Sequence, residues 1–277
     1  MAILGKINPL KVVKTVDFGV YLDGGSDGEI LMPTRYVPEN CEVGDTLSVF
    51  IYTDSEDRLI ATTLTPYAMV GEFACLEVEA VNEVGAFLDW GLMKQLLVPF
   101  REQHAKMQEG GHYPVFIYVD FDSKRITASA KLEKFIDDSH PDLEVNQEVD
   151  LMIYKRTDLG FKAIINQQYS GMLYQNEIFQ PLEMGQKIKG FVKQIREDDK
   201  IDLMLQKPGF EKIDDFAVKL FELLKEADGF LPLTDKSPAD DIYERFGISK
   251  KTFKKAVGDL YKKRQILLEE NGIRLVN

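Results

Sequence analysis

Aromatic side chains flank a glycine near the start of the sequence, an arrangement that suits the stacking of nucleic-acid bases. Phe18 and Tyr21 lie on either side of Gly19, and we expect both rings on the exposed face of a bent strand. A base stacked on such a ring contributes about 1–3 kcal/mol, whatever the base. Packing against a neighbouring domain is the alternative, because residues 1–70 carry 5 Lys and Arg against 10 Asp and Glu.

A second set of candidate residues lies in 149–210, where cations replace most of the rings. We expect the basic residues on a bent strand and on a later strand, with one tyrosine in the preceding loop. Basic side chains on β-strands, with tyrosines nearby, suit contact with a single-stranded nucleic acid. The alternative is that these side chains form a solvated polar face without a ligand. The set consists of Lys155, Arg156, Lys162, the loop residue Tyr169, Tyr174, Lys193 and Arg196.

A third set lies on a predicted basic helix close to the C-terminus. From Lys250 to Arg264 there are seven basic residues and one acid, Asp259. Ser249 is a suitable N-cap, and apolar residues at helical spacing form a stripe on the opposite face. The basic face could contact phosphate, or it could be a solvated surface. The candidates are Lys250, Lys251, Lys254, Lys255 and Lys262.

Motifs typical of enzymes do not accompany these sets. The sequence has no glycine-rich nucleotide loop, no histidines at metal-ligand spacing, and no defensible pairing of serine or cysteine with histidine. Cys41 and Cys75 are too few for a disulfide framework or a cysteine-rich metal site. We therefore expect no enzymatic activity, no cofactor and no metal.

A repeated unit sets the positions of the first two groups of residues. Gly19 and Gly85 are 66 residues apart, and the tetrapeptide VFIY at 49–52 recurs with the same offset at 115–118. A third copy lies 141 residues beyond the first, so that Gly160 corresponds to Gly19. A glycine inside a strand pattern marks a bend or a close backbone approach. Short strands in which apolar and polar residues alternate, the first hairpin bent at a glycine, predict a five-stranded barrel of OB type in each unit.

The predicted fold class is therefore multidomain and mainly β, with three tandem OB-type barrels followed by an α+β winged-helix domain. We predict domains at 1–68, 69–146, 147–208 and 209–277, with the strongest break at Lys207-Pro208-Gly209. The second barrel is expected to end in a helix at 131–136 and a linker. The short apolar joint at 65–71 indicates that the first two barrels pack together, with Trp90 as the packing anchor.

The last domain is predicted from a change of hydrophobic period from 2 to 3.6. Residues 213–224 and 237–246 are expected to form two helices, and Ser249 begins the basic helix. An Asn271-Gly272 turn then joins the strands of a hairpin. This order of elements is that of a winged helix, whose third helix usually meets nucleic acid.

The net charge of −12 is unevenly distributed along the chain. Residues 71–148 carry 7 Lys and Arg against 15 Asp and Glu, whereas 149–210 carry 9 against 8 and 211–277 carry 13 against 13. A surface that meets phosphate is therefore expected in the second half. No apolar run approaches a membrane span and the first residues lack a secretory core, so we expect a cytoplasmic protein without a membrane partner.

Three runs of sequence also carry a family resemblance: VFIYTDSEDRLIATT at 49–63, GAFLDWGL at 85–92 and GMLY at 171–174. The barrels resemble ribosomal-protein S-one-type RNA-binding domains. The whole chain is similar to the conserved virulence factor B (YitL-like) family of Firmicutes, in which three such domains precede a winged helix. The resemblance implies RNA binding without catalysis and a role in post-transcriptional regulation, including that of virulence.

The same resemblance implies a binding face on each barrel. S-one-type domains typically carry two aromatics flanking the strand glycine, a histidine on the next strand and a basic residue near the last strand, and no barrel here has the full set. The corresponding residues are Phe18 and Tyr21 in the first barrel, Phe87 in the second, Pro33, Pro99 and Tyr174 at the histidine position, and Arg125 and Lys200 at the basic position.

These observations leave three functions open. The first is a sequence-tolerant, single-stranded RNA-binding protein that uses the third barrel and the winged helix. The alternative is a transcription regulator that binds DNA through the basic helix. A third hypothesis is an adaptor that docks on the ribosome or on an RNA-processing complex through its acidic first half. The sequence does not fix the oligomeric state.

Overall fold

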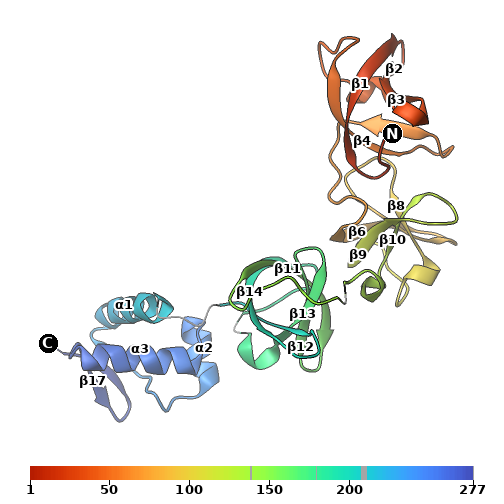
Figure 1. The fold of residues 1–277 in the computed structure, drawn as a ribbon. Helices are drawn as coiled ribbons and strands as arrows, with labels where there is room; N and C mark the ends of the chain where they lie inside the picture. The colour runs from red at the N-terminus through yellow and green to blue at the C-terminus, as the bar shows by residue number, and fades with distance from the viewer. Residues whose placement is uncertain (138, 179, 207–210, 277) are drawn as a thin grey trace.

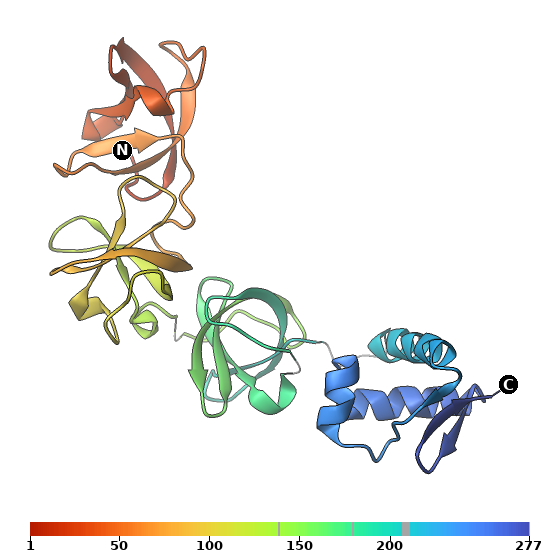
Figure 2. The ribbon, with the colours of Figure 1, turned by 180° about the vertical axis from the view of Figure 1, so that it is seen from behind.

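The computed structural model describes the chain except residues 138, 179, 207–210 and 277 and the side chains of 211–215. Four folded units follow one another from the N-terminus to the C-terminus along a bent, extended path (Figure 1). The view from behind shows the same order, with the two termini in the first and the last unit (Figure 2).

The first unit is a closed barrel with the strand order β1-β2-β3-β5-β4. Side chains alternate between its interior and its surface, and Val12, Leu22 and Met32 are fully buried inside it. The barrel closes because β5 pairs with β4 and also runs parallel to β3. Its strands are β1 (Ile7–Val16), β2 (Gly19–Asp23), β3 (Glu29–Pro33), β4 (Thr46–Thr53) and β5 (Leu59–Thr62).

The second and third units repeat this plan. The second is a five-stranded sheet of order β10-β9-β6-β7-β8, in which β8 lies beside β10, and the third is a closed barrel of order β11-β12-β13-β15-β14. This confirms the prediction of three tandem five-stranded barrels. The strands are β6 (Phe73–Val81), β7 (Gly85–Leu88), β8 (Leu96–Pro99), β9 (His112–Val119), β10 (Ile126–Ser129), β11 (Glu148–Thr157), β12 (Gly160–Ile165), β13 (Tyr169–Tyr174), β14 (Lys187–Ile195) and β15 (Ile201–Met204).

The repeated glycines all lie against the backbone of the next strand. A Cβ atom on Gly19 would come within 2.1 Å of the Met32 carbonyl oxygen, and one on Gly160 within 2.1 Å of the corresponding oxygen of Leu173. Gly85 is similarly placed, with 2.3 Å to the oxygen of Val98. Only glycine permits this approach, so the predicted bend is a shared structural device of the barrels.

The last unit is a winged helix, as predicted. Ser249 caps the third helix by accepting a hydrogen bond from the Thr252 amide, and Gly247 ends the second helix in the left-handed conformation. The two-residue strand β16 was not predicted. The elements are α1 (Glu211–Glu226), β16 (Phe230–Leu231), α2 (Ala239–Phe246), α3 (Lys250–Lys262), β17 (Ile266–Glu269) and β18 (Gly272–Leu275). The predicted break at Lys207-Pro208-Gly209 lies outside the described residues.

The helix predicted at 131–136 is wrong. Only the 3-10 turn η4 (Leu132–Lys134) forms, because the apolar residues of this segment face a sheet. Leu132 is buried, and the ring of Phe135 stacks on Phe116 of β9 with 4.3 Å between ring centroids. The apolar residues of this segment are therefore spaced as in a helix, but they reach the sheet without forming one.

The first two barrels share one apolar core, which confirms the predicted packing. Trp90 is 2% exposed and meets Phe50 of β4 edge to face, with 5.7 Å between ring centroids. Polar contacts surround this core: Arg125 donates to the Asp57 carboxylate at 2.6 Å, and the Lys94 ammonium donates to the backbone oxygen of Asp54 at 2.7 Å. Trp90 is therefore the packing anchor between the two barrels.

The second and third barrels are joined by a smaller apolar cluster. Phe73 and Leu132 of the second barrel are buried with Met152 and Tyr154 of the third. The side-chain amide of Gln167 accepts from the Phe73 amide at 2.6 Å and donates to the Phe73 carbonyl at 3.1 Å, as a paired strand residue would. This contact fixes the third barrel against the start of β6.

Candidate nucleic-acid interface

The open face of the third barrel contains a groove of about 620 Å³. Strands β12 and β13 form its floor, and the turn between β14 and β15 forms one wall. Residues of the linker from the second barrel also line it, among them Asp137 and Pro141. The groove brings together four of the predicted binding residues, Lys162, Tyr169, Tyr174 and Arg196.

Arg196 is held in this groove by a carboxylate. Its Nε donates to Asp202 at 3.1 Å, and its guanidinium also bonds the Tyr174 hydroxyl and lies 5.8 Å from the centroid of that ring. The bond and charge of Asp202, a buried carboxylate, raise the pKa of Arg196 above its usual value. The pair therefore presents a ring and a fixed fork of N–H groups, with its charge largely neutralised.

Some of the other predicted cations of the third barrel are paired with carboxylates, and the rest have no ion pair among the described residues. Lys193 is paired with Glu177, and Lys155 lies 3.1 Å from Glu133 of the second barrel. Lys162 lines the groove, and Arg156 lies 5.8 Å from the Phe161 ring centroid; neither has an ion pair in the part of the chain that the structure describes. The predicted basic face is thus partly compensated by carboxylates.

Tyr169 is placed differently from the prediction. It begins strand β13 and does not lie in a loop, and it is only 8% exposed within the core of the third barrel. Its hydroxyl accepts from the side-chain amide of Gln168 at 3.2 Å. A ring buried in this way has no free face for a base, so we leave Tyr169 out of the proposed surface.

The predicted aromatic pair of the first barrel consists of an exposed and a half-buried ring, Phe18 and Tyr21. Phe18 is 58% exposed and contacts Tyr21 edge to face, with 6.4 Å between ring centroids. The ammonium of Lys14 lies 5.0 Å from the Tyr21 centroid and 3.8 Å from the carboxylate of Glu29. Neither ring belongs to the core shared with the second barrel, so both remain available on the surface.

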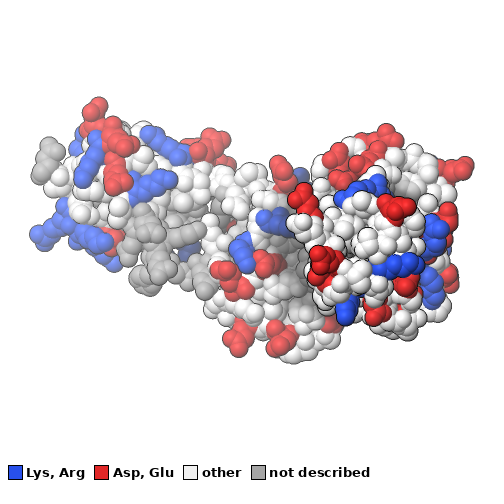
Figure 3. Space-filling view, turned by 90° about the horizontal axis from the view of Figure 1, so that it is seen from above, with Lys and Arg blue, Asp and Glu red and all other residues white. Residues whose placement is uncertain are grey.

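Helix α3 carries the least compensated cations among the predicted residues. Its stripe of Phe253, Ala256, Val257 and Leu260 is buried, and basic side chains line its outer face. Lys254 lies 3.6 Å from Asp235, and Lys250 donates to the backbone oxygen of Lys236. Among the described residues, no ion-pair partner stands beside Lys251, Lys255 or Lys262. Basic side chains also gather along the outer edge of the winged-helix end in Figure 3.

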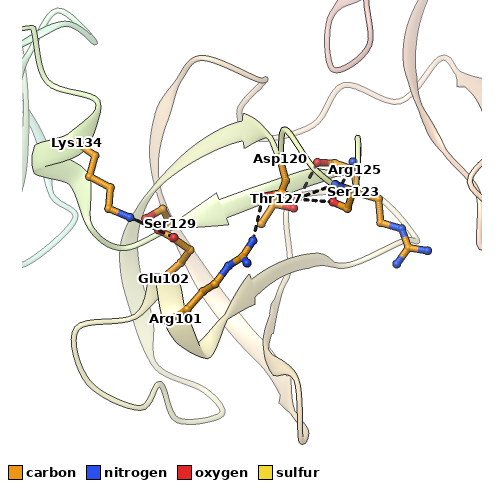
Figure 4. Close-up of polar contacts among 8 residues, drawn as sticks. All are labelled: Arg101, Glu102, Asp120, Ser123, Arg125, Thr127, Ser129 and Lys134. Atoms are coloured by element: carbon orange, nitrogen blue, oxygen red, sulfur yellow. Dashed lines mark hydrogen bonds and ion pairs between the residues drawn. The ribbon is translucent and has the colours of Figure 1, made fainter.

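The second barrel holds basic residues that the sequence analysis did not single out. Arg101 reaches Asp120 at 3.1 Å, and the same carboxylate accepts from the amide and hydroxyl of Ser123 (Figure 4). Lys94 is partly buried at the joint with the first barrel, and this burial lowers its pKa. The 66-residue repeat could have drawn attention to Arg101, because it aligns this residue with another arginine, Arg35.

Arg125 provides a pH-dependent contact between the barrels. Its hydrogen bonds, followed by its charge, hold the pKa of the Asp57 carboxyl below the usual value. The stabilisation is therefore complete above the unfolded pKa of Asp57, about 3.9, and is lost as the pH falls through the lower folded value. We expect Arg125→Gln to move the Asp57 pKa back up, as followed by NMR titration of its carboxyl carbon. An unchanged pKa would contradict this pairing.

Comparison with known proteins identifies domain families and similar proteins. Residues 4–64 and 70–131 match the S1 domain family, and residues 218–275 match the CvfB-like winged helix domain. Conserved virulence factor B of Staphylococcus epidermidis RP62A is 27% identical over 283 residues, which cover 99% of this chain and 95% of that protein. The chain thus carries S1 domains and a CvfB-like winged helix domain and is similar over its full length to proteins named conserved virulence factor B.

Other similar proteins also align over nearly the whole chain. The protein YitL of Bacillus subtilis is 29% identical over 271 residues, covering 95% of this chain and 90% of that protein. A solved structure described as a multidomain protein with nucleic acid binding domains, from Streptococcus pneumoniae TIGR4, is 26% identical with a TM-score of 0.43 and covers 99% of this chain and 98% of that chain.

The domain make-up of the chain supports nucleic-acid binding, since OB-type barrels and winged helices both serve this purpose. The S1 matches fall on the first two barrels, and the third barrel shares their strand order. These domain families are not typically catalytic. Within the described residues, no group of three His, Cys, Asp or Glu side chains could hold a metal ion, and no helix is long and apolar enough to cross a membrane.

Proposed function

We propose that this chain is a non-catalytic, cytoplasmic protein that binds single-stranded RNA with little sequence preference and regulates gene expression after transcription. Lys251, Lys255 and Lys262 of α3, which have no ion-pair partner in the described part of the chain, carry this proposal. Cations without carboxylate partners are free to replace the counterions of a phosphate backbone. The groove of the third barrel supplies the second contact.

The groove favours a single strand over a duplex. Tyr174 is half-buried at its edge, and Lys162 and Arg196 lie beside it. A base can stack on such a ring only when it is not stacked within a duplex. Because stacking is indifferent to base identity, this contact provides affinity with little sequence preference.

Tyr174→Ala tests the groove. We expect the affinity of the full chain for a mixed-sequence single-stranded RNA to fall about tenfold, the effect of losing one stacked base. The measurement is a fluorescence anisotropy titration with a labelled oligoribonucleotide over a series of salt concentrations. Phe121→Ala is the matched control, because Phe121 is 82% exposed on the second barrel and outside the groove. Equal affinities for wild type, Tyr174→Ala and Phe121→Ala would remove the groove from the proposal.

Binding of duplex DNA is the second candidate. The exposed lysines of α3 favour it, because this helix of a winged helix commonly enters the major groove. The wing opposes it, since the exposed Glu269 and Glu270 stand near its turn. Unlabelled duplex DNA that displaces RNA more effectively than single-stranded RNA itself would favour the DNA-binding regulator.

Docking on a ribosomal or RNA-processing protein is a further proposed role for the first half. Residues 1–148 carry 12 Lys and Arg against 25 Asp and Glu, a surface complementary to basic proteins. Failure of the chain to bind either nucleic acid would bring this adaptor function to first place.

A further inference from the structure

The sheet of the winged-helix domain ends in an open edge that the proposed function does not use. Its three strands lie in the order β16-β18-β17, so β17 pairs with β18 on one side, and no other strand of the described chain lies on its other side. The β17–β18 hairpin is at the end of the molecule away from the three barrels (Figures 1 and 2). Another polypeptide can therefore reach this edge without meeting the barrels.

Backbone groups of β17 point out of the sheet at this edge. The Val276 amide donates to the Gln265 carbonyl at 3.0 Å, which shows that the backbone of Gln265 faces β18. Because the direction alternates along an antiparallel strand, every second residue after Gln265 also faces β18. The N–H and C=O groups of Ile266 and Leu268 then point to the open edge. Such groups are a template for pairing with a further strand.

The open edge lacks the features that usually prevent such pairing. Natural edge strands are often interrupted by lysine, proline or a bulge. Strand β17 reads Ile-Leu-Leu-Glu and keeps a regular register with β18. Leu267 is 50% exposed and Leu268 is 52% exposed. As successive residues they project from opposite faces of the sheet, so both faces offer apolar surface beside the edge.

Two opposite charges stand at the ends of this strand. Arg264 lies three residues before Leu267 and Glu270 lies three residues after it, and both are exposed. Neither side chain has an ion pair or a hydrogen bond within the described part of the chain, whereas the neighbouring Glu269 is paired with Arg274. An antiparallel copy with Leu267 opposite Leu267 brings each Arg264 beside the partner's Glu270. The strand is therefore complementary in charge to itself.

We propose that β17 pairs antiparallel with β17 of a second copy of this chain, about a two-fold axis at Leu267. In this register Ile266 lies opposite the partner's Leu268, and both residues present their backbone groups to the edge, so they exchange hydrogen bonds. The symmetry repeats this pair on the other side of the axis. Because the strand has only four residues, the association is weak and monomer and dimer coexist.

The pairing also places the two copies of α3. Ile266 and Ile273 of the hairpin share the core of the domain with Phe253 of α3, so this helix covers one face of the sheet. A two-fold axis perpendicular to the sheet leaves that face on the same side in both copies. Both α3 helices then lie on one side of the joined sheet. The pairing requires none of the residues proposed to bind RNA, so its failure would leave the proposed function standing.

Sedimentation velocity of the full chain, over micromolar to millimolar concentrations, measures the association. We expect the sedimentation coefficient to rise with concentration as the dimer forms. Leu267→Lys places two positive charges opposite each other at the axis and is expected to abolish this rise. Val218→Lys is the matched control, because Val218 is 60% exposed on α1 and lies outside the sheet. The control is expected to dimerise like the wild type, and circular dichroism establishes that each variant is folded.

Exchange of the flanking charges tests the register. Arg264→Glu alone and Glu270→Arg alone each turn two cross-strand ion pairs into pairs of like charges, so each is expected to weaken dimerisation about tenfold. The variant with both substitutions is expected to dimerise as the wild type does. An effect of net charge would differ, because one substitution adds negative charge to an acidic chain and the other removes it.

The results separate the pairing from its alternatives. Weaker dimers in both single variants, with recovery in the double variant, support the proposed edge and register. A wild-type chain that stays monomeric at every concentration overturns the proposal. A dimer that persists in Leu267→Lys overturns it too, since another surface would then join the copies. Opposite effects of Arg264→Glu and Glu270→Arg would assign the association to net charge and contradict the register.

Discussion

Replacement of Trp90 by alanine is expected to destabilise the paired first and second barrels by about 3–5 kcal/mol, the usual cost of removing a buried aromatic side chain. Trp90 is 2% exposed, contacts Phe50 of the other barrel and donates its indole N–H to the Lys94 carbonyl. The substitution removes the anchor of the shared core and leaves that carbonyl without its partner. Urea unfolding of the full chain followed by circular dichroism measures the effect.

Phe121→Ala is the control for this experiment. Phe121 belongs to the same barrel but is 82% exposed, so its loss is expected to change the unfolding free energy by no more than about 0.5 kcal/mol. A change below about 1 kcal/mol for Trp90→Ala would show that the barrels do not depend on each other through this residue.

Neutralising the outer face of α3 is expected to have the largest effect on nucleic-acid affinity. The variant combines Lys251→Gln, Lys255→Gln and Lys262→Gln, the lysines of this helix whose ammonium groups have neither an ion-pair partner nor a hydrogen-bond acceptor among the described residues. If each contacts one phosphate, the slope of log affinity against log salt falls by about 2, because a single strand contributes about 0.7 per contact. At about 0.1 M salt this corresponds to a loss of about 100-fold.

The matched control also removes three positive charges. Lys11→Gln, Lys219→Gln and Lys236→Gln alter exposed lysines outside α3 and are expected to leave the salt slope nearly unchanged. If both triple variants weaken RNA binding to the same extent, the contribution is one of net charge, and α3 is not the contact surface. If neither variant changes the slope, the winged helix has no part in RNA binding.

Much of the fold could be predicted from local sequence because its determinants are local. The glycines at the barrel bends are recognisable by their spacing, and their lack of a Cβ is what lets neighbouring backbones approach. In the winged helix, Ser249 and Gly247 mark helix ends by their own conformations and hydrogen bonds. Each of these signals requires only neighbouring residues or one repeated offset.

The errors arose where local patterns compete with tertiary contacts. The apolar spacing of residues 131–136 is that of a helix, but Phe135 stacks on Phe116 of β9 and the segment follows the sheet. Tyr169 stands between strand patterns in the sequence, yet β13 begins with it and buries its ring. Both outcomes depend on a surface built from distant residues.

The sequence by itself determined the repeated barrels, the winged helix and the concentration of acidic residues in the first half. Only the tertiary structure decided which cations are free, because ion pairs form between residues far apart in the chain. Lys155 is neutralised by Glu133 and Arg125 by Asp57, while Lys251, Lys255 and Lys262 of α3 have no ion-pair partner among the described residues. The shared core at Trp90 likewise exists only because two barrels pack together, and no single repeat encodes it.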